Sequence, residues 1–280
     1  MPEPSVGIIV LNWNGLADTR ECLLSLAGLR AVKPQIYVVD NGSTDGSVDA
    51  LYKEFSHSIT QLVNGRNLLY AGGNNVGILR ALEDGSSHLL LLNNDTVVDP
   101  DLVSELVKAS DQHPNSILCP KIYYAARPNT LWYAGGKLNL RRARIAHRGI
   151  RELDRGQYDR MEATGWATGC ALFAPRLVFE TVGLLDDSFQ LYSEDVDYCL
   201  RAKAAGFRTI FVPSAKLWHK VSSAVGGNLS QNKLKRKWNS LRRLLKKHLP
   251  NPMMRYWALT DFVITEPFRV VIAGLRGRLR

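Results

Sequence analysis

The sequence of 280 residues lacks several features that assign a chain at once to a class of protein. It has no uninterrupted run of about 18 apolar residues, which argues against a simple transmembrane helix. Its four cysteines, Cys22, Cys119, Cys170 and Cys199, form no CxxC pair and no cluster with histidine. This spacing argues against a zinc or dithiol motif and is typical of buried thiols in a reducing compartment.

Two further absences concern targeting and nucleotide binding. The first ten residues, MPEPSVGIIV, have no basic segment ahead of an apolar one, so we predict no secretory signal and a cytoplasmic protein. Neither the dinucleotide motif GxGxxG nor the phosphate-binding motif GxxxxGK[ST] occurs where a strand would pass into a helix. A bound nucleotide would therefore need something else for its phosphates, and a divalent metal would serve.

Charge is distributed unevenly along the chain. The formal net charge is +10, but residues 231–280 carry 13 lysines and arginines and two acidic residues, hence +11. Residues 1–230 carry 23 basic and 24 acidic residues, hence −1. The body is nearly neutral, so we expect an anionic partner to meet the tail.

Apolar strand patterns alternate with helical patterns over the first 112 residues. Strands are predicted at 6–11, 36–39 and 60–63. The first two are each followed by a helical pattern, and the third by a loop at 67–75 (NLLYAGGNN) and then a helix through about Leu82. A fourth strand contains the leucine run at 89–92, which is typical of a strand buried on both faces. Alternation of this kind predicts parallel strands joined by right-handed crossovers, in an α/β layer of the nucleotide-binding type.

The predicted strands end in polar side chains, among them Asn12, Asp40 and the NND run at 93–95. Ligands bind at the carboxyl ends of the strands in open α/β sheets. Asp40 could accept a hydrogen bond from the imide of a pyrimidine or from a ribose hydroxyl, and Gly73 would let the backbone approach a flat ring. Ordinary turn and cap chemistry explains each residue equally well.

The alternation stops beyond residue 112. Residues 128–158 are predicted to be a long loop, with four arginines at 141, 142, 144 and 148. Such a loop is either a functional lid or a solvated face. A strand is predicted at 165–174, and Pro175 opens a helix that ends near Gly183.

A second polar cluster lies in SEDVDYCLR, residues 193–201. Glu194, Asp195 and Asp197 fall in or near the first turn of a predicted helix, where acids complement the helix dipole. Three acids in one turn also repel one another, and such crowding shifts pKa values at working sites. His219 follows a strand predicted at 209–212 and is either an ordinary surface or core residue or a ligand.

The basic tail contains an amphipathic helical pattern. Leu234, Trp238, Leu241, Leu245 and Leu249 recur at spacings of three and four, with lysines and arginines over much of the remaining surface. This pattern suits an anionic membrane surface, with Trp238 at the level of the headgroups. Residues 256–275 are more apolar but carry charges and a proline, which indicates an in-plane or docking helix. Nucleic acid is the competing partner; no recognised motif supports it, so we predict no nucleic-acid partner.

Six segments, taken in order, carry a resemblance to a known family: VGIIVLNWNG, VVDNGSTDGS, NLLYAGGNNVGI, LLLLNNDTVV, GWATGCALFAPR and SEDVDYCLRAKAAGF. Over about residues 6–227 the chain resembles the family 2 glycosyltransferases, particularly their rhamnosyltransferase-like members. The resemblance implies the α/β GT-A fold, with a nucleotide-sugar-binding half at 1–112 and an acceptor-binding half at 113–227. The remaining residues, 228–280, would form basic amphipathic C-terminal helices.

The same resemblance implies roles for particular residues. It places the donor at Asn12, Asp40, Gly73, Asn74, Asn75, Asn93, Asn94 and Asp95. The NND run stands where the family has its metal-binding DxD, so Asp95 would be the main protein ligand of Mn²⁺ or Mg²⁺. His219 stands where some relatives have an additional metal ligand. Asp195 matches the general base, and Glu194 would support the acceptor.

The implied activity is that of a metal-dependent inverting hexosyltransferase. It would move rhamnose or another hexose from a dTDP- or UDP-sugar to a hydroxyl of a glycan or lipid-linked acceptor, in cell-envelope polysaccharide synthesis. The enzyme would be cytoplasmic, held peripherally on the inner face of the cell membrane by its C-terminal helices. The alternative is a catalytically silent, membrane-associated scaffold with the same fold; the presence of Asp95 and of the Glu194 and Asp195 pair counts against it.

Overall fold

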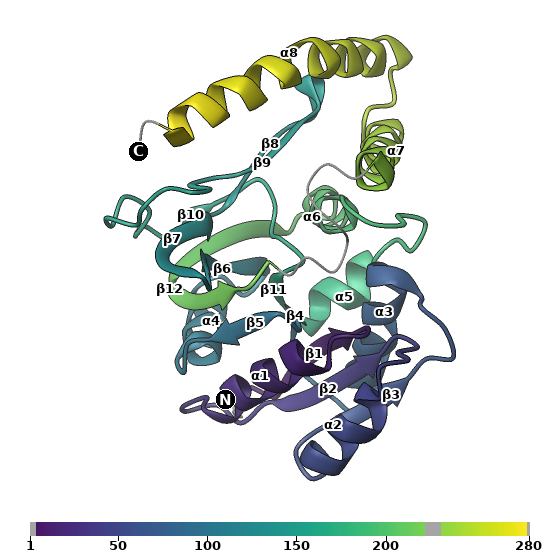
Figure 1. Cartoon of the computed structure of the whole chain (residues 1–280), viewed down its shortest axis with the longest axis vertical. Helices are drawn as coiled ribbons and strands as arrows, with labels where there is room; N and C mark the ends of the chain where they lie inside the picture. Colours follow the sequence, from purple (N-terminus) through teal and green to yellow (C-terminus); the bar gives the residue numbers. More distant parts are fainter. Residues whose placement is uncertain (1–3, 222–230, 279–280) are drawn as a thin grey trace.

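The computed structural model describes residues 4–221 and 231–278 and shows strands and helices in regular alternation in its first half (Figure 1). The elements there are β1 (Val6–Asn12), α1 (Leu16–Ala27), β2 (Gln35–Asp40), α2 (Ser47–Phe55), β3 (Thr60–Val63), α3 (Leu69–Glu83) and β4 (His88–Asn93). The four strands pair in parallel in the order β3-β2-β1-β4. The predicted parallel layer is therefore confirmed.

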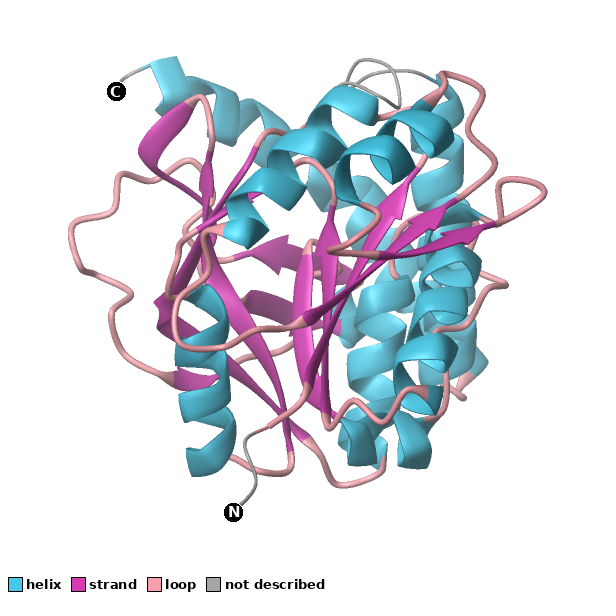
Figure 2. Cartoon of the chain, turned by 90° about the horizontal axis from the view of Figure 1, so that it is seen from below, coloured by secondary structure: helices cyan, strands magenta, loops and turns pink. Residues whose placement is uncertain are grey.

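The second half extends the same sheet with strands of both directions. Its elements are β5 (Thr96–Val98), α4 (Leu102–Gln112), β6 (Ser116–Tyr124), β7 (Arg127–Tyr133), β8 (Gly136–Asn139), the 3-10 turn η1 (Leu140–Arg142), β9 (Arg144–His147), β10 (Glu162–Ala163), β11 (Ala171–Pro175), α5 (Arg176–Val182), α6 (Glu194–Ala204), β12 (Arg208–His219), α7 (Gln231–His248) and α8 (Pro252–Arg278). The sheet has ten strands in the order β10-β12-β6-β11-β4-β1-β2-β3, with β5 paired to β12 and β7 to β6. Helices lie on both faces of this sheet (Figure 2).

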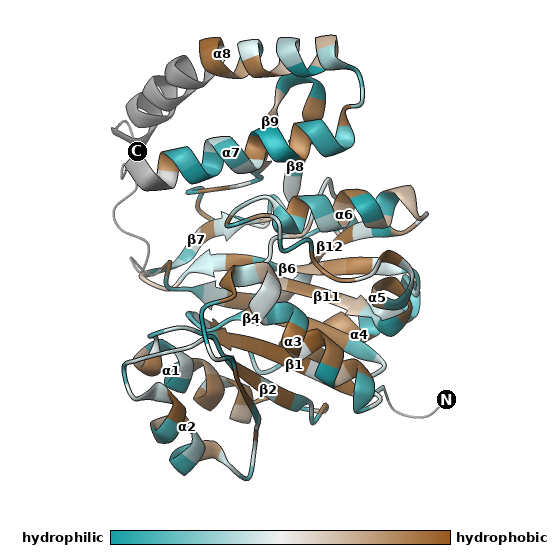
Figure 3. Cartoon of the chain, turned by 90° about the vertical axis from the view of Figure 1, so that its right-hand side faces the viewer, coloured by the Kyte–Doolittle hydropathy of each residue, from teal (hydrophilic) through white to brown (hydrophobic). Residues whose placement is uncertain are grey.

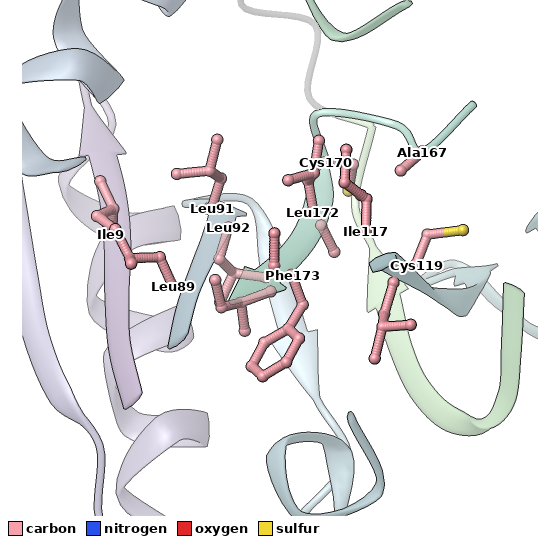
Figure 4. Close-up of a cluster of buried hydrophobic side chains, with 14 of the residues drawn as sticks. Ile9, Leu89, Leu91, Leu92, Ile117, Cys119, Ala167, Cys170, Leu172 and Phe173 are labelled. Carbon is pink, nitrogen blue, oxygen red and sulfur yellow. The ribbon is translucent and has the colours of Figure 1, made fainter. Parts of the chain in front are cut away.

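The leucine run forms the centre of the core. All four leucines at 89–92 are at most 2% exposed, because β4 lies between β1 and β11 and its two faces are covered (Figure 4). β11 pairs antiparallel with β4, so Phe173 lies opposite Leu90. A strand buried in this way delivers the polar residues that follow it to a fixed place at the edge of the core.

The loop predicted at 67–75 is wrong beyond Leu68, because α3 begins at Leu69. The glycines that suggested a loop instead let the helix lie close to β1. A Cβ atom at Gly73 would come within 2.5 Å of Leu11 Cδ1, and one at Gly77 within 2.5 Å of Ile9 Cγ2. Close packing of a helix on a sheet is a use of glycine that composition alone does not separate from a turn.

The long loop predicted at 128–158 is wrong over residues 128–147, whereas residues 148–158 form a loop with one isolated bridge. β7 pairs antiparallel with β6, and β8 and β9 form a separate hairpin joined by η1. The four arginines suggested a lid or a solvated face, but Arg148 makes contacts within the protein. Its guanidinium pairs with Glu162 and lies 5.1 Å from the ring centroid of Tyr158.

α8 is the outermost element, and α7 lies between it and α6 (Figures 1 and 3). Leu241 and Leu245 of α7, with Leu249 directly after it, form a small core with Ala258 of α8 and with Ala143, between η1 and β9. The prediction that this apolar face of α7 meets a membrane is therefore wrong. Protein covers it instead, and the Trp238 ring lies 6.2 Å from that of Phe262. Within the described ranges, no helix combines the length and apolar character needed to cross a bilayer.

Candidate functional site

Asn12 and Asp40 lie opposite each other at the ends of β1 and β2, and both are at most 1% exposed. Asn12 Nδ2 donates hydrogen bonds to Asp40 Oδ2 at 2.7 Å and to Ser47 Oγ at 2.9 Å. The backbone N–H of Ser43 donates to Asp40 Oδ1 at 2.8 Å, and the Thr19 hydroxyl donates to Asn12 Oδ1 at 2.7 Å. This network orders the loop after β2, whereas direct contact of Asp40 with a base stays a prediction.

The residues of α3 that were predicted to line the donor site take part in packing. Asn74 is buried, and its Nδ2 donates to the carbonyl of Tyr70 at 2.9 Å. Asn75 exchanges two hydrogen bonds with the backbone of Leu185, at 2.9 and 3.0 Å. Gly73 lies against Leu11. Their contact with a donor stays a prediction, and their observed contacts fix α3 to the rest of the molecule.

The NND run forms the turn from β4 to β5, and the structure brings His219 to it. Asn93 ends β4, and the Asn94 Nδ2 donates to Thr19 Oγ1 at 2.9 Å. Asp95 Oδ1 lies 3.0 Å from His219 Nε2, because the end of β12 pairs with β5. Both side chains are buried, at 7% and 6% exposure. Two residues 124 apart in sequence therefore form one polar pair.

Asp95 and His219 fit a divalent metal as a site with two protein ligands. A carboxylate and an imidazole are ligands that Mn²⁺ accepts. His219 presents Nε2 to Asp95, so Nε2 is the ring nitrogen that would share a metal with this carboxylate. No group of three or more histidines, cysteines or acids suited to a metal occurs among the residues that the structure describes. Substrate phosphates or water would therefore complete the ligand set.

Glu194 and Asp195 open α6, and their surroundings favour the neutral carboxylic acids. Burial raises the pKa of Asp195. The N–H groups of Gly169 and Val196 each donate to its carboxylate at 2.8 Å and lower the pKa, but by less than burial raises it. Burial and the neighbouring Asp195 raise the pKa of Glu194 to about 8. Glu194 Oε2 is buried and accepts no hydrogen bond from any described residue. A pair of acids with raised pKa values is the pattern expected at a working site.

Asp197, the third acid of the predicted cluster, has a structural role. It is fully buried and forms ion pairs with Arg201 at 2.8 Å, Lys247 at 2.9 Å and His248 at 2.8 Å. Although burial raises its pKa, the hydrogen bonds from His248, Lys247 and Arg201 hold that pKa below the ordinary value. Asp197 therefore anchors α7 to α6 as an ionised group.

The two residues before Glu194 have unusual backbone conformations. Tyr192 and Ser193 adopt φ values of 74° and 68°, in the left-handed region that disfavours residues other than glycine. α7 holds this segment, since Ser240 Oγ donates to the Leu191 carbonyl at 2.7 Å and Lys237 Nζ lies 5.2 Å from the Tyr192 ring centroid. The conformation at the start of α6 therefore depends on the tail.

The segment Gly169 and Cys170 connects the two acidic sites. The N–H of Asn93 donates to the Cys170 carbonyl at 2.9 Å, and the N–H of Gly169 donates to Asp195 Oδ2 at 2.8 Å. Burial raises the pKa of the Cys170 thiol, and the nearby carboxylates of Asp95 and Asp195 raise it further. The Gly169 and Cys170 segment therefore lies near both the acid at the end of β4 and the acids at the start of α6.

Sequence reasoning missed several neighbours of this site. The Tyr70 hydroxyl donates to the Gly169 carbonyl at 2.5 Å, and the Trp132 ring lies edge-on between His147 and His219, at centroid distances of 4.4 and 4.5 Å. Gly169 was visible in the motif GWATGC but was assigned to a plain strand. Trp132 lies in the region predicted as a loop, where no pattern pointed to the site.

Sequence comparisons match the chain to one family and to several relatives. The family model for glycosyl transferase family 2 matches residues 5–178. The low-salt glycan biosynthesis hexosyltransferase Agl10 of Haloferax volcanii is 26% identical over 202 residues, which span 71% of this chain and 61% of Agl10. The N-acetylglucosaminyl-diphospho-decaprenol L-rhamnosyltransferase of Mycobacterium tuberculosis is 28% identical over 225 residues, which span 72% of this chain and 71% of that protein.

Solved structures establish the fold. GalNAc-T7 with UDP, GalNAc and Mn²⁺ superposes with a TM-score of 0.69 at 14% identity, over 87% of this chain and 48% of that one. The mannosyltransferase PcManGT of Pyrobaculum calidifontis, in complex with GDP-Man and Mn²⁺, superposes with a TM-score of 0.61 at 15% identity, over 99% and 81%. The predicted α/β GT-A fold is thereby confirmed.

Proposed function

Because the chain belongs to glycosyl transferase family 2, we propose that it is an inverting hexosyltransferase with a pyrimidine nucleoside diphosphate donor. The observation that supports this most is that the Gly169 and Cys170 segment lies near both Asp95 and Asp195, the proposed metal ligand and the proposed base. dTDP-rhamnose is our first choice of donor and a UDP-sugar our second. The names of the relatives, a hexosyltransferase and a diphospho-decaprenol L-rhamnosyltransferase, support a lipid-linked or glycan acceptor in cell-envelope synthesis.

Asp195 is the proposed general base. Its carboxylate would take the proton of the acceptor hydroxyl as that oxygen attacks the anomeric carbon, an assistance that typically contributes about 10² to 10⁴ in rate. The N–H groups of Gly169 and Val196 fix the orientation of the carboxylate. Glu194, kept neutral at moderate pH by its raised pKa, would hydrogen-bond the acceptor through Oε2.

Asp95 and His219 would hold the divalent metal on the phosphate side of the site. The metal supplies Lewis-acid neutralisation of the nucleoside diphosphate that departs. Asn93 and Asn94 extend the same turn, and Asn94 is already oriented by Thr19. With the base and the leaving-group site on different elements, a single displacement with inversion requires no protein nucleophile.

Asn12 and Asp40 would act on the donor through the loop after β2. Their side chains are buried and mutually hydrogen-bonded, so they set the position of Ser43 and of the backbone beside it. We propose that this loop, together with Asn41 and the start of α3, meets the base and ribose. Gly73 permits the close approach of α3 on which that arrangement depends.

The outer face of α8, which we define as Met253, Tyr256, Trp257, Val263 and Ile264, is the proposed membrane contact. These side chains are 57 to 68% exposed, and their spacings of three, four and seven place them on one side of the helix. α8 is the outermost helix (Figure 3). Aromatic and aliphatic side chains on one face of a basic helical segment suit the surface of an anionic bilayer. This arrangement would hold the enzyme peripherally on the inner face of the cell membrane.

A donor screen tests the proposed function. The purified chain is incubated with Mn²⁺, a lipid-linked sugar extract and either dTDP-rhamnose or a UDP-sugar, and products are identified by mass spectrometry. We expect transfer with one donor and an inverted anomeric configuration by NMR. Absence of transfer and of any thermal stabilisation by Mn²⁺ with each nucleotide would instead favour the silent scaffold.

A further inference from the structure

A cavity of about 550 Å³ lies between α7, the beginning of α8 and the segment before α6. Its lining residues are Ser188, Gln190, Arg236, Asn239, Ser240, Arg242, Arg243, Leu245, Lys246, Arg255 and Leu259. Five of them are cationic and none is acidic. None of these five cations forms an ion pair with a described carboxylate, although cations elsewhere in the same layer do. Lys247 pairs with Asp186 and Asp197, and Arg142 pairs with Asp261.

This charge pattern calls for an anionic ligand. Cations gathered around one concave space repel one another, and the repulsion falls when an anion binds among them. Guanidinium groups match phosphate oxygens in a bidentate geometry, and Arg236, Arg242, Arg243 and Arg255 supply four of them. The cavity therefore has the chemistry of a phosphate site.

The position of the cavity separates it from the donor site. It lies on the far side of α6 from the parallel strands, where α7 faces α8 (Figures 1 and 3). Leu259 lies on α8 and lines the cavity, so the cavity adjoins the helix that carries the proposed membrane contact. On its other side, Ser240 lines the cavity and donates to Leu191, three residues before Glu194. A ligand here would lie between a bilayer and the catalytic acids.

We propose that this cavity binds the diphosphate of a membrane-embedded, lipid-linked acceptor. The proposal rests on the proposed function, which requires an acceptor hydroxyl near Asp195. Four arginines and Lys246 bind the phosphate oxygens, while Leu245 and Leu259 meet the first carbons of the lipid chain. Binding at this place delivers the sugar beyond the diphosphate towards Glu194 and Asp195.

The test uses the full chain and vesicle sedimentation without any donor, so that it does not depend on turnover. One set of vesicles is phosphatidylcholine with geranylgeranyl diphosphate, and the other is phosphatidylcholine with phosphatidylglycerol at equal surface charge. The variant Arg243→Gln/Lys246→Gln removes two cavity cations. The control Lys235→Gln/Lys203→Gln removes the same charge from exposed positions that do not line the cavity.

We expect the cavity variant to bind the diphosphate vesicles at least about tenfold more weakly than the control, and the phosphatidylglycerol vesicles equally well. Equal binding of the two variants to the diphosphate vesicles would overturn the proposal, as would an equal loss on both kinds of vesicle, which indicates a site for any anionic headgroup. Equal melting temperatures of the two variants show that both are folded. Failure of the donor screen with retained diphosphate binding would count against the catalytic proposal alone.

Discussion

The polar side chains at the ends of β1 and β2 differ from those at the start of α6 in how completely the protein satisfies them. Asn12 and Asp40 are buried, and both oxygens of Asp40 accept hydrogen bonds from neighbouring protein groups. Glu194 is also buried, at 7% exposure, yet its Oε2 accepts no hydrogen bond from the described residues and its pKa is raised. The first cluster therefore has a structural role, since its acceptors are already satisfied by the protein. The second cluster has an unused acceptor that a substrate can bind.

Removing Asp40 is expected to have the largest effect on stability, because it breaks the hydrogen-bonded cluster of Asn12 and Asp40. Asp40→Ala leaves Asn12 Nδ2 and the Ser43 N–H without their buried acceptor, and unsatisfied buried donors cost about 1 to 3 kcal/mol each. We predict a loss of about 3 kcal/mol in the free energy of unfolding, measured by urea denaturation. Asp45→Ala is the matched control, since Asp45 also accepts from Ser47 but is exposed, and we expect a loss of about 1 kcal/mol. Equal losses in the two variants would show that the hydrogen bonds to the buried Asp40 contribute no more to stability than those to the exposed Asp45.

Replacing Asp95 tests whether its pair with His219 has a structural role, like that of Asn12 and Asp40, or binds a metal. We predict that Asp95→Ala weakens Mn²⁺-dependent binding of a nucleoside diphosphate by about a hundredfold in calorimetry, because it removes the main carboxylate ligand. The exposed Asp49→Ala on α2 should bind as the unaltered chain does. Unchanged, Mn²⁺-dependent binding by Asp95→Ala would place the metal elsewhere.

The pH dependence of kcat and of stability tests the roles assigned to Asp195 and Glu194. Transfer needs the ionised form of Asp195, whose pKa is raised by burial, so kcat should rise with pH as this carboxyl group ionises. Because the folded state holds the Glu194 proton up to about pH 8, above the ordinary value of 4.5, its contribution to stability falls as pH rises between those values. For Glu194→Gln we predict that kcat depends on a single ionisation. We also predict that its free energy of unfolding falls less with rising pH than that of the unaltered chain. A kcat that falls towards pH 8 would contradict this assignment.

The smallest predicted effect concerns the support that α7 gives to the site. Ser240→Ala removes the hydrogen bond to the Leu191 carbonyl and should lower the transfer rate about threefold, because the left-handed Tyr192 and Ser193 lose a constraint. Ser104→Ala removes a similar bond, to the Asp101 carbonyl in α4, and should leave the rate unchanged. A rate unaffected in both variants would show that the tail does not support the acids.

The sequence predicted the parts of this molecule that depend on local pattern. The leucine run at 89–92 forms the buried strand it indicates, and Glu194 opens a helix as the cluster of acids suggests. The motif order led to the α/β GT-A fold. In each of these cases the residues that determine the structure are close together in the chain.

The failures concern contacts between distant segments. Nothing local shows that Gly169 and Cys170 lie between the two acids. The proximity of His219 and Asp95 was expected only from the resemblance to the family, and the 3.0 Å contact between them agrees with it. The apolar face of α7 was assigned to a membrane because a pattern of leucines does not say what covers it; here α8 and Ala143 do. Glycine in NLLYAGGNN suggested a loop, although Gly73 allows a helix to pack closely.

The most direct test of the proposed site measures two quantities in one variant, Asp195→Asn. Asparagine keeps the size of the side chain and an oxygen that can accept the Gly169 N–H, but it cannot take a proton at neutral pH. We predict a single-turnover transfer rate lower by about 10³, with the dissociation constant of the nucleoside diphosphate within about twofold of the unaltered chain. A transfer rate close to that of the unaltered chain would contradict the assignment of Asp195 as the base.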